Sequence, residues 1–430
     1  MTMTNFHQIG KDEITRARKL LGEDFPQIGS HYLILSSANG DSVYDIYGKR
    51  YIDCTSQNWV AAIGHNHPKV ISSVKKCIDD GLVHAITRVD TIPKLKLANR
   101  IIDLSPGNMT SVSFCLGGSL AVEGAMKLCL HNRTDSRFAV LEGSYHGRTL
   151  ATIMLSFLRK LKPEFNSIFK DGPIELPRAY CYRCKYDKKY PNCSFECIID
   201  TDKILSSTRP IGLVYEPIQG DGGQLSFPPE YHVKLAGLCK KYDIPLIVDE
   251  IQTGFGKLKT IFASDMYNIK PDIIAFGKAA GGGLPFFGTV SGDKFKWQER
   301  DHTFTFSHFP LGIVAALTTL DIIEDEKVCE QADEKGRWLI KELRLLQSTH
   351  KDIGDVRGEG MLIGVELVKN GKEANKEGCS KLIDYGIDNG VLFGCDFYQG
   401  NVLKIKPPSI IGYDSMSKVL DVIDSGLRKL

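Results

Sequence analysis

The sequence predicts an α/β fold with a large domain around a mostly parallel central sheet and a smaller α+β domain made from the N- and C-terminal segments. Between about residues 110 and 310, short apolar runs alternate with amphipathic stretches. This pattern is typical of buried parallel strands connected by helices. Beyond about residue 310 the alternation stops, because helical stretches come first and strand-like runs follow. A separate α+β unit is therefore expected there.

Each element follows from its hydrophobic period and its turn residues. Residues 12–22 and 70–82 have the spacing of amphipathic helices, and the alternation over 43–53 around Gly48 predicts a hairpin. The expected strands of the large sheet are SVSFCL (111–116), RFAVLE (137–142), IGLVYEPI (211–218), PLIVDE (245–250) and PDIIAFG (271–277). The later strands are GMLIGVELV (360–368), VLFGCDF (391–397) and VLKIKP (402–407). The expected helices cover 121–130, 231–242, 312–325, 327–346 and about 414–428.

These patterns suggest three parts of the chain. Residues 1–60 form an N-terminal segment that joins the small domain, and residues 61–320 form the large domain. The large domain carries a cysteine-rich insertion at 178–200, and residues 321–430 complete the small domain.

The composition limits the partners and the compartment. The 54 Lys and Arg residues nearly balance 52 Asp and Glu residues, so no nucleic acid or anionic membrane is expected as partner. No apolar run is long enough for a membrane span, and the first residues do not resemble a signal peptide. Most of the 12 cysteines lie in apolar segments, which favours a reducing cytoplasm.

Two strand ends carry candidate catalytic groups. Asp249 ends the strand PLIVD, and Gln252 follows three residues later. A carboxylate there could hold a pyridine nitrogen in its protonated form, although an Asp that caps the next turn would look the same. Lys278 follows the strand PDIIAFG and precedes three glycines. Partial burial would lower its pKa and make its amine a nucleophile, whereas a surface lysine before a turn is the alternative.

Two other motifs suit a flat, phosphorylated cofactor. Gly117, Gly118 and Ser119 open a predicted helix, whose free N–H groups favour an anion. Tyr145 follows a strand in GSYHGRT and could stack on a ring, or simply pack. Each signal is weak by itself, so their order along the chain matters more.

Taken together, the motifs resemble the class III (ω-amino-acid) pyridoxal-phosphate (PLP)-dependent aminotransferases, of fold type I. The resemblance extends from about residue 40 to about residue 410. The matching segments are GHNHPKV, the GGS helix start, YHGRT, EPIQGDGG, VDEIQTGFG, FGKAAGGGLP, HTFTFSHFPLG and VRGEGMLIGVEL.

The resemblance implies a role for each matching residue. Lys278 would bind PLP covalently and move the proton, and Asp249 would pair with the pyridine nitrogen. The other cofactor contacts would come from Gly118, Ser119, Tyr145, His146, Glu216 and Gln252. Thr305 would contact the phosphate in the neighbouring subunit, which implies a homodimer with active sites at the interface. The expected substrate-binding residues are Trp59, Arg148, Asp221 and Lys404.

One departure concerns substrate choice. In many members of the family a glutamate in EPIQGE pairs with an arginine in a later RxxPP segment to form a gate, whereas this chain has Asp221 and Lys404 at these positions. Lysine keeps the charge but loses the planar fork of arginine. A modified gate could admit a bulky or non-carboxylate substrate, and neutral drift explains the change equally well.

The insertion AYCYRCKYDKKYPNCSFECIID is the second distinctive feature. Cys181, Cys184, Cys193 and Cys197 follow the spacing C-x2-C-x8-C-x3-C. Four thiolates could hold zinc or an iron–sulfur cluster, while free thiols or a disulfide are the alternatives. Similar insertions occur in the family's transaminases of aminoglycoside pathways.

The favoured hypothesis is an aminotransferase that moves an amino group between glutamate and a small-molecule aldehyde or ketone remote from an α-carboxylate. The expected partner is a 6′-oxo aminoglycoside intermediate of antibiotic biosynthesis. The alternatives are an ω-amino-acid transaminase for ornithine, acetylornithine or 4-aminobutyrate, an aminomutase of the glutamate-semialdehyde type, a racemase, or a non-catalytic protein with the same fold.

Overall fold

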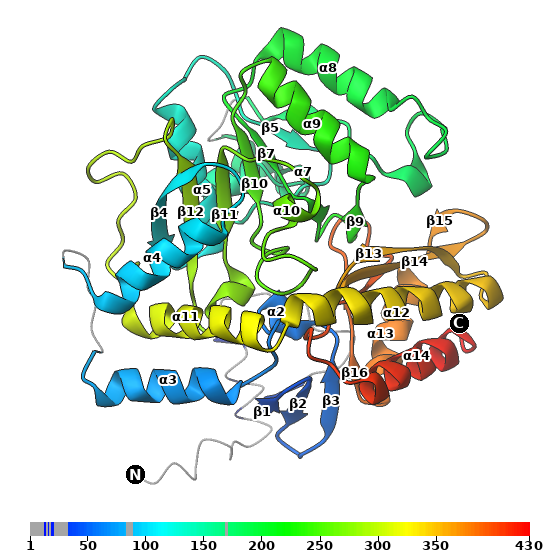
Figure 1. The fold of residues 1–430 in the computed structure, drawn as a ribbon. Coiled ribbons are helices and arrows are strands. Elements are labelled where there is room, and N and C mark those ends of the chain that lie inside the picture. Colours follow the sequence, from blue (N-terminus) through cyan, green and yellow to red (C-terminus); the bar gives the residue numbers. More distant parts are fainter. Residues whose placement is uncertain (1–12, 14–15, 17–18, 21–32, 83–88, 168–170) are drawn as a thin grey trace.

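A seven-stranded sheet forms the centre of the computed structural model, which describes residues 13, 16, 19–20, 33–82, 89–167 and 171–430 (Figure 1). In spatial order its strands are β4 (Met109–Cys115), β12 (Phe287–Gly292), β11 (Ile273–Phe276), β10 (Leu246–Asp249), β7 (Leu213–Tyr215), β5 (Ala139–Leu141) and β6 (Ile174–Leu176). The strands from β11 to β6 are parallel, and β12 is antiparallel to both of its neighbours. The predicted mostly parallel sheet is confirmed.

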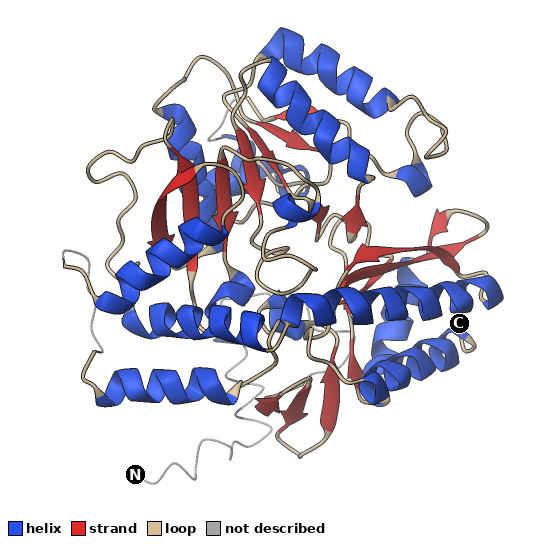
Figure 2. Cartoon of the chain, viewed as in Figure 1, coloured by secondary structure: helices blue, strands red, loops and turns tan. Residues whose placement is uncertain are grey.

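Helices cover both faces of this sheet (Figure 2). Val214 and Ile247 share a core with α5 (Gly118–Leu130) on one face. The next residues along the same strands point the other way, so Tyr215 and Val248 pack with α9 (Pro229–Lys241) and α8 (Glu196–Thr208). Further along that side, α11 (Pro310–Asp325), α3 (Pro68–Asp79) and α4 (Ile92–Leu104) pack on the sheet. Burial on both faces explains the continuous apolar runs of the strands.

The two ends of the chain meet in a second core. The N-terminal strands β1 (Leu35–Asn39), β2 (Ser42–Asp45) and β3 (Arg50–Asp53) form a sheet whose last member is β16 (Val391–Leu392), parallel to β3. A second sheet holds β13 (Ile353–Glu359), β14 (Leu362–Lys369), β18 (Val402–Ile405) and β17 (Gly394–Cys395), with β15 (Glu373–Ala374) beside β14. Helices α12 (Val328–Thr349), α13 (Lys376–Asp388) and α14 (Tyr413–Leu427) pack on this core.

The smaller elements lie between these layers. They are α2 (Ser56–Trp59), α6 (Leu150–Met154), α7 (Leu158–Leu161), α10 (Ala263–Met266), the β8–β9 pair (Ile218–Gln219 and Leu225–Ser226), and the short 3₁₀ turns Pro163–Ser167, Cys181–Arg183 and Lys278–Gly281. Among the described residues, no helix is both long and apolar enough to cross a membrane.

Two of the predicted strands are wrong in detail. VLFGCDF was expected to be one strand, but it divides into β16 and β17, which belong to different sheets. Phe393 lies between them and is fully buried in the second core, so the chain turns around this side chain. IGLVYEPI also breaks, between β7 and β8, at Pro217, which has no N–H group for a sheet.

One strand of the structure was not predicted, and one predicted helix lies mostly outside the described residues. Strand β12 was not expected, although it lies between β4 and β11 in the sheet. The predicted helix at 12–22 falls mostly outside the described residues, of which 13, 16, 19 and 20 are helical.

Candidate active site

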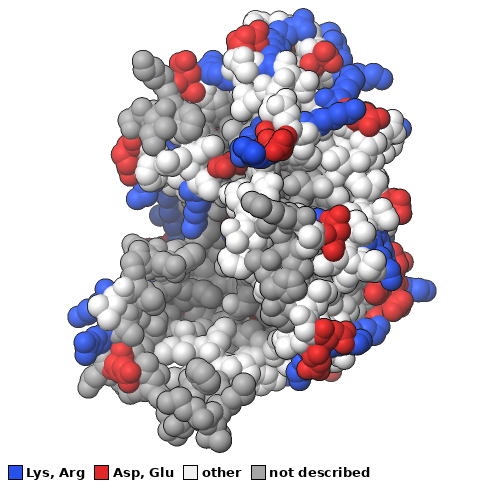
Figure 3. Space-filling view, turned by 90° about the vertical axis from the view of Figure 1, so that its left-hand side faces the viewer, with Lys and Arg blue, Asp and Glu red and all other residues white. Residues whose placement is uncertain are grey.

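A pocket of about 510 Å³ lies where the large sheet meets the C-terminal sheet. Its walls include Tyr145 and Lys278 from the large sheet, and Lys404 and Lys406 from β18 and the residue after it. Residues 54–59, which follow β3, contribute Trp59. Charged side chains outside the pocket are mixed in sign, as Figure 3 shows for the described part of one face.

Lys278 stands at the end of β11, as predicted. Its backbone is left-handed (φ 48°), and such positions cost energy for residues other than glycine and are frequent at functional sites. Gly277 precedes it because a Cβ there would collide with the Phe287 ring. Burial lowers the pKa of Lys278, and the charges of Asp221, Asp249 and Glu216 partly oppose that shift. The amine therefore has more of its nucleophilic, neutral form than an exposed lysine.

Asp249 and His146 form a buried pair beneath the pocket. Asp249 ends β10, and its Oδ2 lies 2.8 Å from His146 Nδ1. The other imidazole nitrogen, Nε2, is buried without a hydrogen-bond partner among the described residues. Gln252 likewise has a buried, unpartnered Oε1 within the described part of the chain. The structure thus leaves unused hydrogen-bonding capacity beside these two predicted site residues.

Glu216 supports the loop that carries Tyr145. Its two carboxylate oxygens accept hydrogen bonds from the backbone N–H of Tyr145 (2.8 Å) and of Gly220 (3.1 Å). Burial raises the pKa of Glu216 to about 7, with His146 acting to lower it and Asp249 to raise it. This carboxyl group therefore changes its protonation near neutral pH.

The predicted anion site lies at the start of α5. Gly118 and Ser119 occupy the first turn of this 13-residue helix, whose preceding residue, Gly117, makes no capping hydrogen bond through a side chain. Ser119 Oγ accepts a hydrogen bond from the backbone N–H of Arg148 (3.0 Å). Thr305 is exposed and does not line the pocket. Its predicted contact with a partner subunit stays a prediction.

Trp59 and its neighbours form the wall opposite the large sheet. Four consecutive residues, Ser56 to Trp59, have positive φ angles between 45° and 71°. Left-handed backbone costs roughly 1–2 kcal/mol per residue other than glycine. This strained turn presents the Trp59 ring to the amines of Lys278 and Lys404, each 4.6 Å from the ring centroid.

Asp221 and Lys404 form the ion pair that the resemblance implied. Lys404 Nζ lies 2.7 Å from Asp221 Oδ1, and both side chains are almost fully buried. The charges of Lys404 and Lys406 hold the pKa of Asp221 below its usual value, although burial opposes them. Arg148 lies at the exposed rim, with its guanidinium 5.9 Å from the Tyr145 ring and 6.0 Å from the Phe397 ring.

Lys406 was not among the predicted site residues, although it lines the pocket with its Nζ 3.2 Å from the Trp59 centroid. The pattern Lys-Ile-Lys in LKIKPP could have revealed it, because alternate residues of a strand face the same side.

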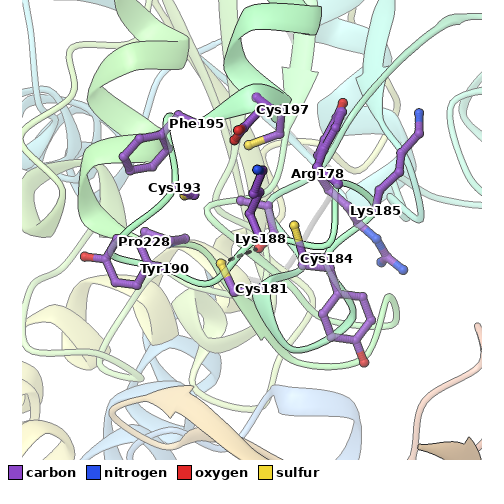
Figure 4. A pocket seen from close by; sticks show the side chains of 14 residues that line it. Arg178, Cys181, Cys184, Lys185, Lys188, Tyr190, Cys193, Phe195, Cys197 and Pro228 are labelled. Atoms are coloured by element: carbon purple, nitrogen blue, oxygen red, sulfur yellow. Dashed lines mark hydrogen bonds between the residues drawn. The ribbon is translucent and has the colours of Figure 1, made fainter.

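The four cysteines of the insertion line a second, small cavity of about 30 Å³, away from the pocket (Figure 4). All four are free thiols. Their sulfur atoms face a common space, beside Phe195 and Tyr190 (Figure 4). No group of three or more His, Cys, Asp or Glu side chains in the described ranges is arranged to hold a metal ion. The choice between a metal site and free thiols at this cluster stays a prediction. The insertion instead contacts β14, where Arg183 pairs with Glu366 at 2.6 Å.

The family model described as aminotransferase class-III matches residues 26–427. The chain belongs to this family. The acetylornithine aminotransferase of Methanosarcina mazei is 32% identical over 398 residues, which cover 92% of each chain. The leucine/methionine racemase of Thermococcus litoralis is 30% identical and covers 92% of this chain and 90% of its own. An (S)-enantioselective omega-transaminase from Thermomicrobium roseum superposes with a TM-score of 0.87 at 25% identity, covering 98% and 99% of the two chains.

This class III aminotransferase is a PLP-dependent enzyme. The residues present fit that cofactor. The Lys278 amine opens into a pocket at the carboxyl end of β11, where ligands of parallel sheets bind. Asp249 ends the neighbouring strand. Among the described residues, the buried atoms His146 Nε2 and Gln252 Oε1 have no hydrogen-bond partner. The first turn of α5 is a suitable anion site.

Proposed function

We propose that this aminotransferase moves an amino group between the ω-position of an amino acid, such as N-acetylornithine, and 2-oxoglutarate, giving glutamate. The observation that carries the proposal is the pocket itself. A lysine with a lowered pKa opens into it, and three further basic side chains line it: Arg148 at the rim beside Tyr145, and Lys404 and Lys406 on the opposite wall. A cationic wall suits substrates with carboxylates. The similarity to acetylornithine aminotransferases supports the same substrate class.

The residues at the sheet would serve the cofactor. PLP, when bound, supplies an electron-withdrawing ring and a carbon that accepts the amino group. Lys278 would hold PLP covalently and move the proton at the substrate carbon. Asp249, oriented by His146 at 2.8 Å, would keep a proton on the ring nitrogen. Gln252, through its unpartnered Oε1, would accept a hydrogen bond from the ring hydroxyl. Gly118 and Ser119 would hold the phosphate, and Tyr145 would pack on the ring.

The amino-sugar hypothesis is not supported. Aminoglycosides carry several positive charges, and the described lining of the pocket holds Arg148, Lys404 and Lys406 against a single carboxylate, Asp221. That carboxylate is already paired with Lys404 at 2.7 Å. A polycationic acceptor would therefore be repelled, whereas a carboxylate would be attracted. The replacement of the usual glutamate–arginine pair by Asp221 and Lys404 does not need a non-carboxylate substrate.

A homodimer remains part of the proposal. Thr305 is exposed, far in sequence from the phosphate site at Ser119, and does not line the pocket of its own chain. Its proposed place is beside the cofactor phosphate of a second copy. Analytical ultracentrifugation would test the dimer directly.

A screen of amino donors tests the substrate class. The PLP-loaded enzyme is mixed with 2-oxoglutarate and N-acetylornithine, ornithine, 4-aminobutyrate or neamine, and glutamate is measured by mass spectrometry. We expect an ω-amino acid to give the highest kcat/KM. Faster reaction of neamine would overturn the proposal, as would racemisation of leucine or methionine without transfer to 2-oxoglutarate. The variant Lys418→Ala, which replaces an exposed lysine of α14, serves as a control and should show the same order of donors as the wild type.

A further inference from the structure

Lys406 is a buried amine that has no hydrogen-bond partner among the described residues. Its side chain is 1% exposed, and its Nζ makes no hydrogen bond within the described part of the chain. The nitrogen lies 3.2 Å from the centroid of the Trp59 ring, on the wall of the pocket. A buried ammonium group that lacks a hydrogen bond is costly, so such groups are rare unless a ligand completes them.

A second buried lysine shows what a structural partner looks like. Lys257 is also fully buried, but its Nζ donates to Ser56 Oγ (2.9 Å) and to the backbone carbonyl of Pro407 (3.2 Å). Lys257 therefore ties α2 to the segment that follows β18. Lys406 lies one residue before Pro407 and has no comparable bond among the described residues. Apart from its contact with the Trp59 ring, the Lys406 amine makes no side-chain link between the described elements.

The nearby charges compensate Lys406 only in part, because Asp221 favours its ammonium form while three neighbouring amines oppose it. Among the residues that the structure describes, Asp221 is the one carboxylate that lines the pocket, and Lys404 pairs with it at 2.7 Å. Two further amines, Lys278 and Lys257, act on Lys406 in the same repulsive sense as Lys404. Burial and then Lys404 lower the pKa of Lys406 well below its ordinary value. An anion placed against this amine would relieve both effects.

We infer that Lys406 binds the carboxylate of the ω-amino-acid substrate, while Lys404 stays paired with Asp221. The inference rests on the proposed function and names the residue that recognises its substrate. Of the three basic side chains that line the pocket besides Lys278, Arg148 is exposed at the rim and Lys404 is already paired. Lys406 is the one whose amine is both buried in the pocket and unpartnered among the described residues. Trp59 would shield the new ion pair from water.

A pair of substrates that differ only in the carboxylate tests this inference. N-acetylputrescine is N-acetylornithine without its carboxylate. In the PLP-loaded wild type, kcat/KM for N-acetylornithine should exceed that for N-acetylputrescine. In Lys406→Met this ratio should fall about 10- to 100-fold, the value of one charge-assisted hydrogen bond. The change should lie mainly in KM for N-acetylornithine, since N-acetylputrescine does not use the amine.

Thermal unfolding provides a second readout that does not depend on activity. Replacement of a lysine that makes structural hydrogen bonds should lower Tm, and we expect this result for Lys257→Met. Lys406→Met should keep or raise Tm in the absence of substrate, because it removes an unpaired buried amine. N-acetylornithine should raise the Tm of the PLP-loaded wild type but not that of Lys406→Met.

The outcomes separate the two ideas. If wild type uses N-acetylornithine but Lys406→Met keeps the wild-type substrate ratio, the inference is wrong and the proposed function stands. If Lys406→Met lowers Tm as much as Lys257→Met, the amine is structural and the inference is also wrong. If wild type transfers no amino group from any ω-amino acid, the proposed function itself fails.

Discussion

The two walls of the pocket differ in how their charges are balanced. On the side of the large sheet, each carboxylate has protein partners, since Asp249 pairs with His146 and Glu216 accepts two backbone N–H bonds. On the opposite side, cations outnumber carboxylates and Lys406 has no partner among the described residues. A charge that the protein satisfies is held in position, whereas an unsatisfied charge is available to a ligand. We therefore propose that the first wall carries the chemistry and that the second selects the substrate.

Among substitutions on the first wall, removal of the Lys278 amine should lower activity the most. Lys278→Ala should lower kcat about 10⁴-fold or more, because it removes both the covalent attachment of PLP and the proton carrier. Steady-state formation of glutamate from N-acetylornithine would measure the loss. The absorbance of protein-bound PLP should change as well. Activity within tenfold of wild type would show that another group carries the reaction.

Neutralisation of Asp249 tests whether its charge, rather than its hydrogen bond, is needed. Asp249→Asn keeps a hydrogen-bonding partner for His146 but removes the negative charge. We expect kcat to fall roughly 10²- to 10³-fold, a loss of about 3–4 kcal/mol of transition-state stabilisation. The ratio between N-acetylornithine and N-acetylputrescine should not change. A change in that ratio would contradict the division between the two walls.

The buried ion pair sharpens the description of the second wall. Asp221→Asn leaves Lys404 and Lys406 without a counter-charge, and should lower the free energy of unfolding by about 3 kcal/mol. Lys404→Met should cost less, since Lys406 can turn to Asp221. Denaturant unfolding of both variants and of the double variant measures the difference. Equal losses for the two single variants would show that Lys406 does not share this carboxylate.

The smallest expected effect is a pH dependence at Glu216. Its pKa is raised from 4.5 to about 7 by burial, so between these pH values the folded protein holds a proton that the unfolded chain has released. The free energy of unfolding should therefore fall as pH rises from about 4.5 to about 7. Glu216→Gln, which cannot ionise, should lose less over the same range. Tm measured at half-unit steps, with and without the substitution, gives the comparison.

Much of the first wall could be predicted from local pattern. Apolar runs identified β10 and β11, and neighbouring parallel strands bring their carboxyl ends together, so Asp249 and Lys278 were expected on one edge. The pairing of Asp221 with Lys404 came from the family resemblance and was placed correctly. The second wall was harder to predict. No local rule shows that the turn Ser56–Trp59 would be left-handed, or that Trp59 would meet residues of β18.

The sequence by itself determined the strand-end positions of the reactive groups, because side-chain periodicity and strand direction are local properties. The tertiary structure decided which charges are paired. Lys404 and Lys406 lie two residues apart and face the same pocket, yet only Lys404 has a carboxylate within hydrogen-bonding distance among the described residues. That difference depends on where Asp221, far away along the chain, comes to rest. The packing that buries Lys406 also keeps water from solvating its amine.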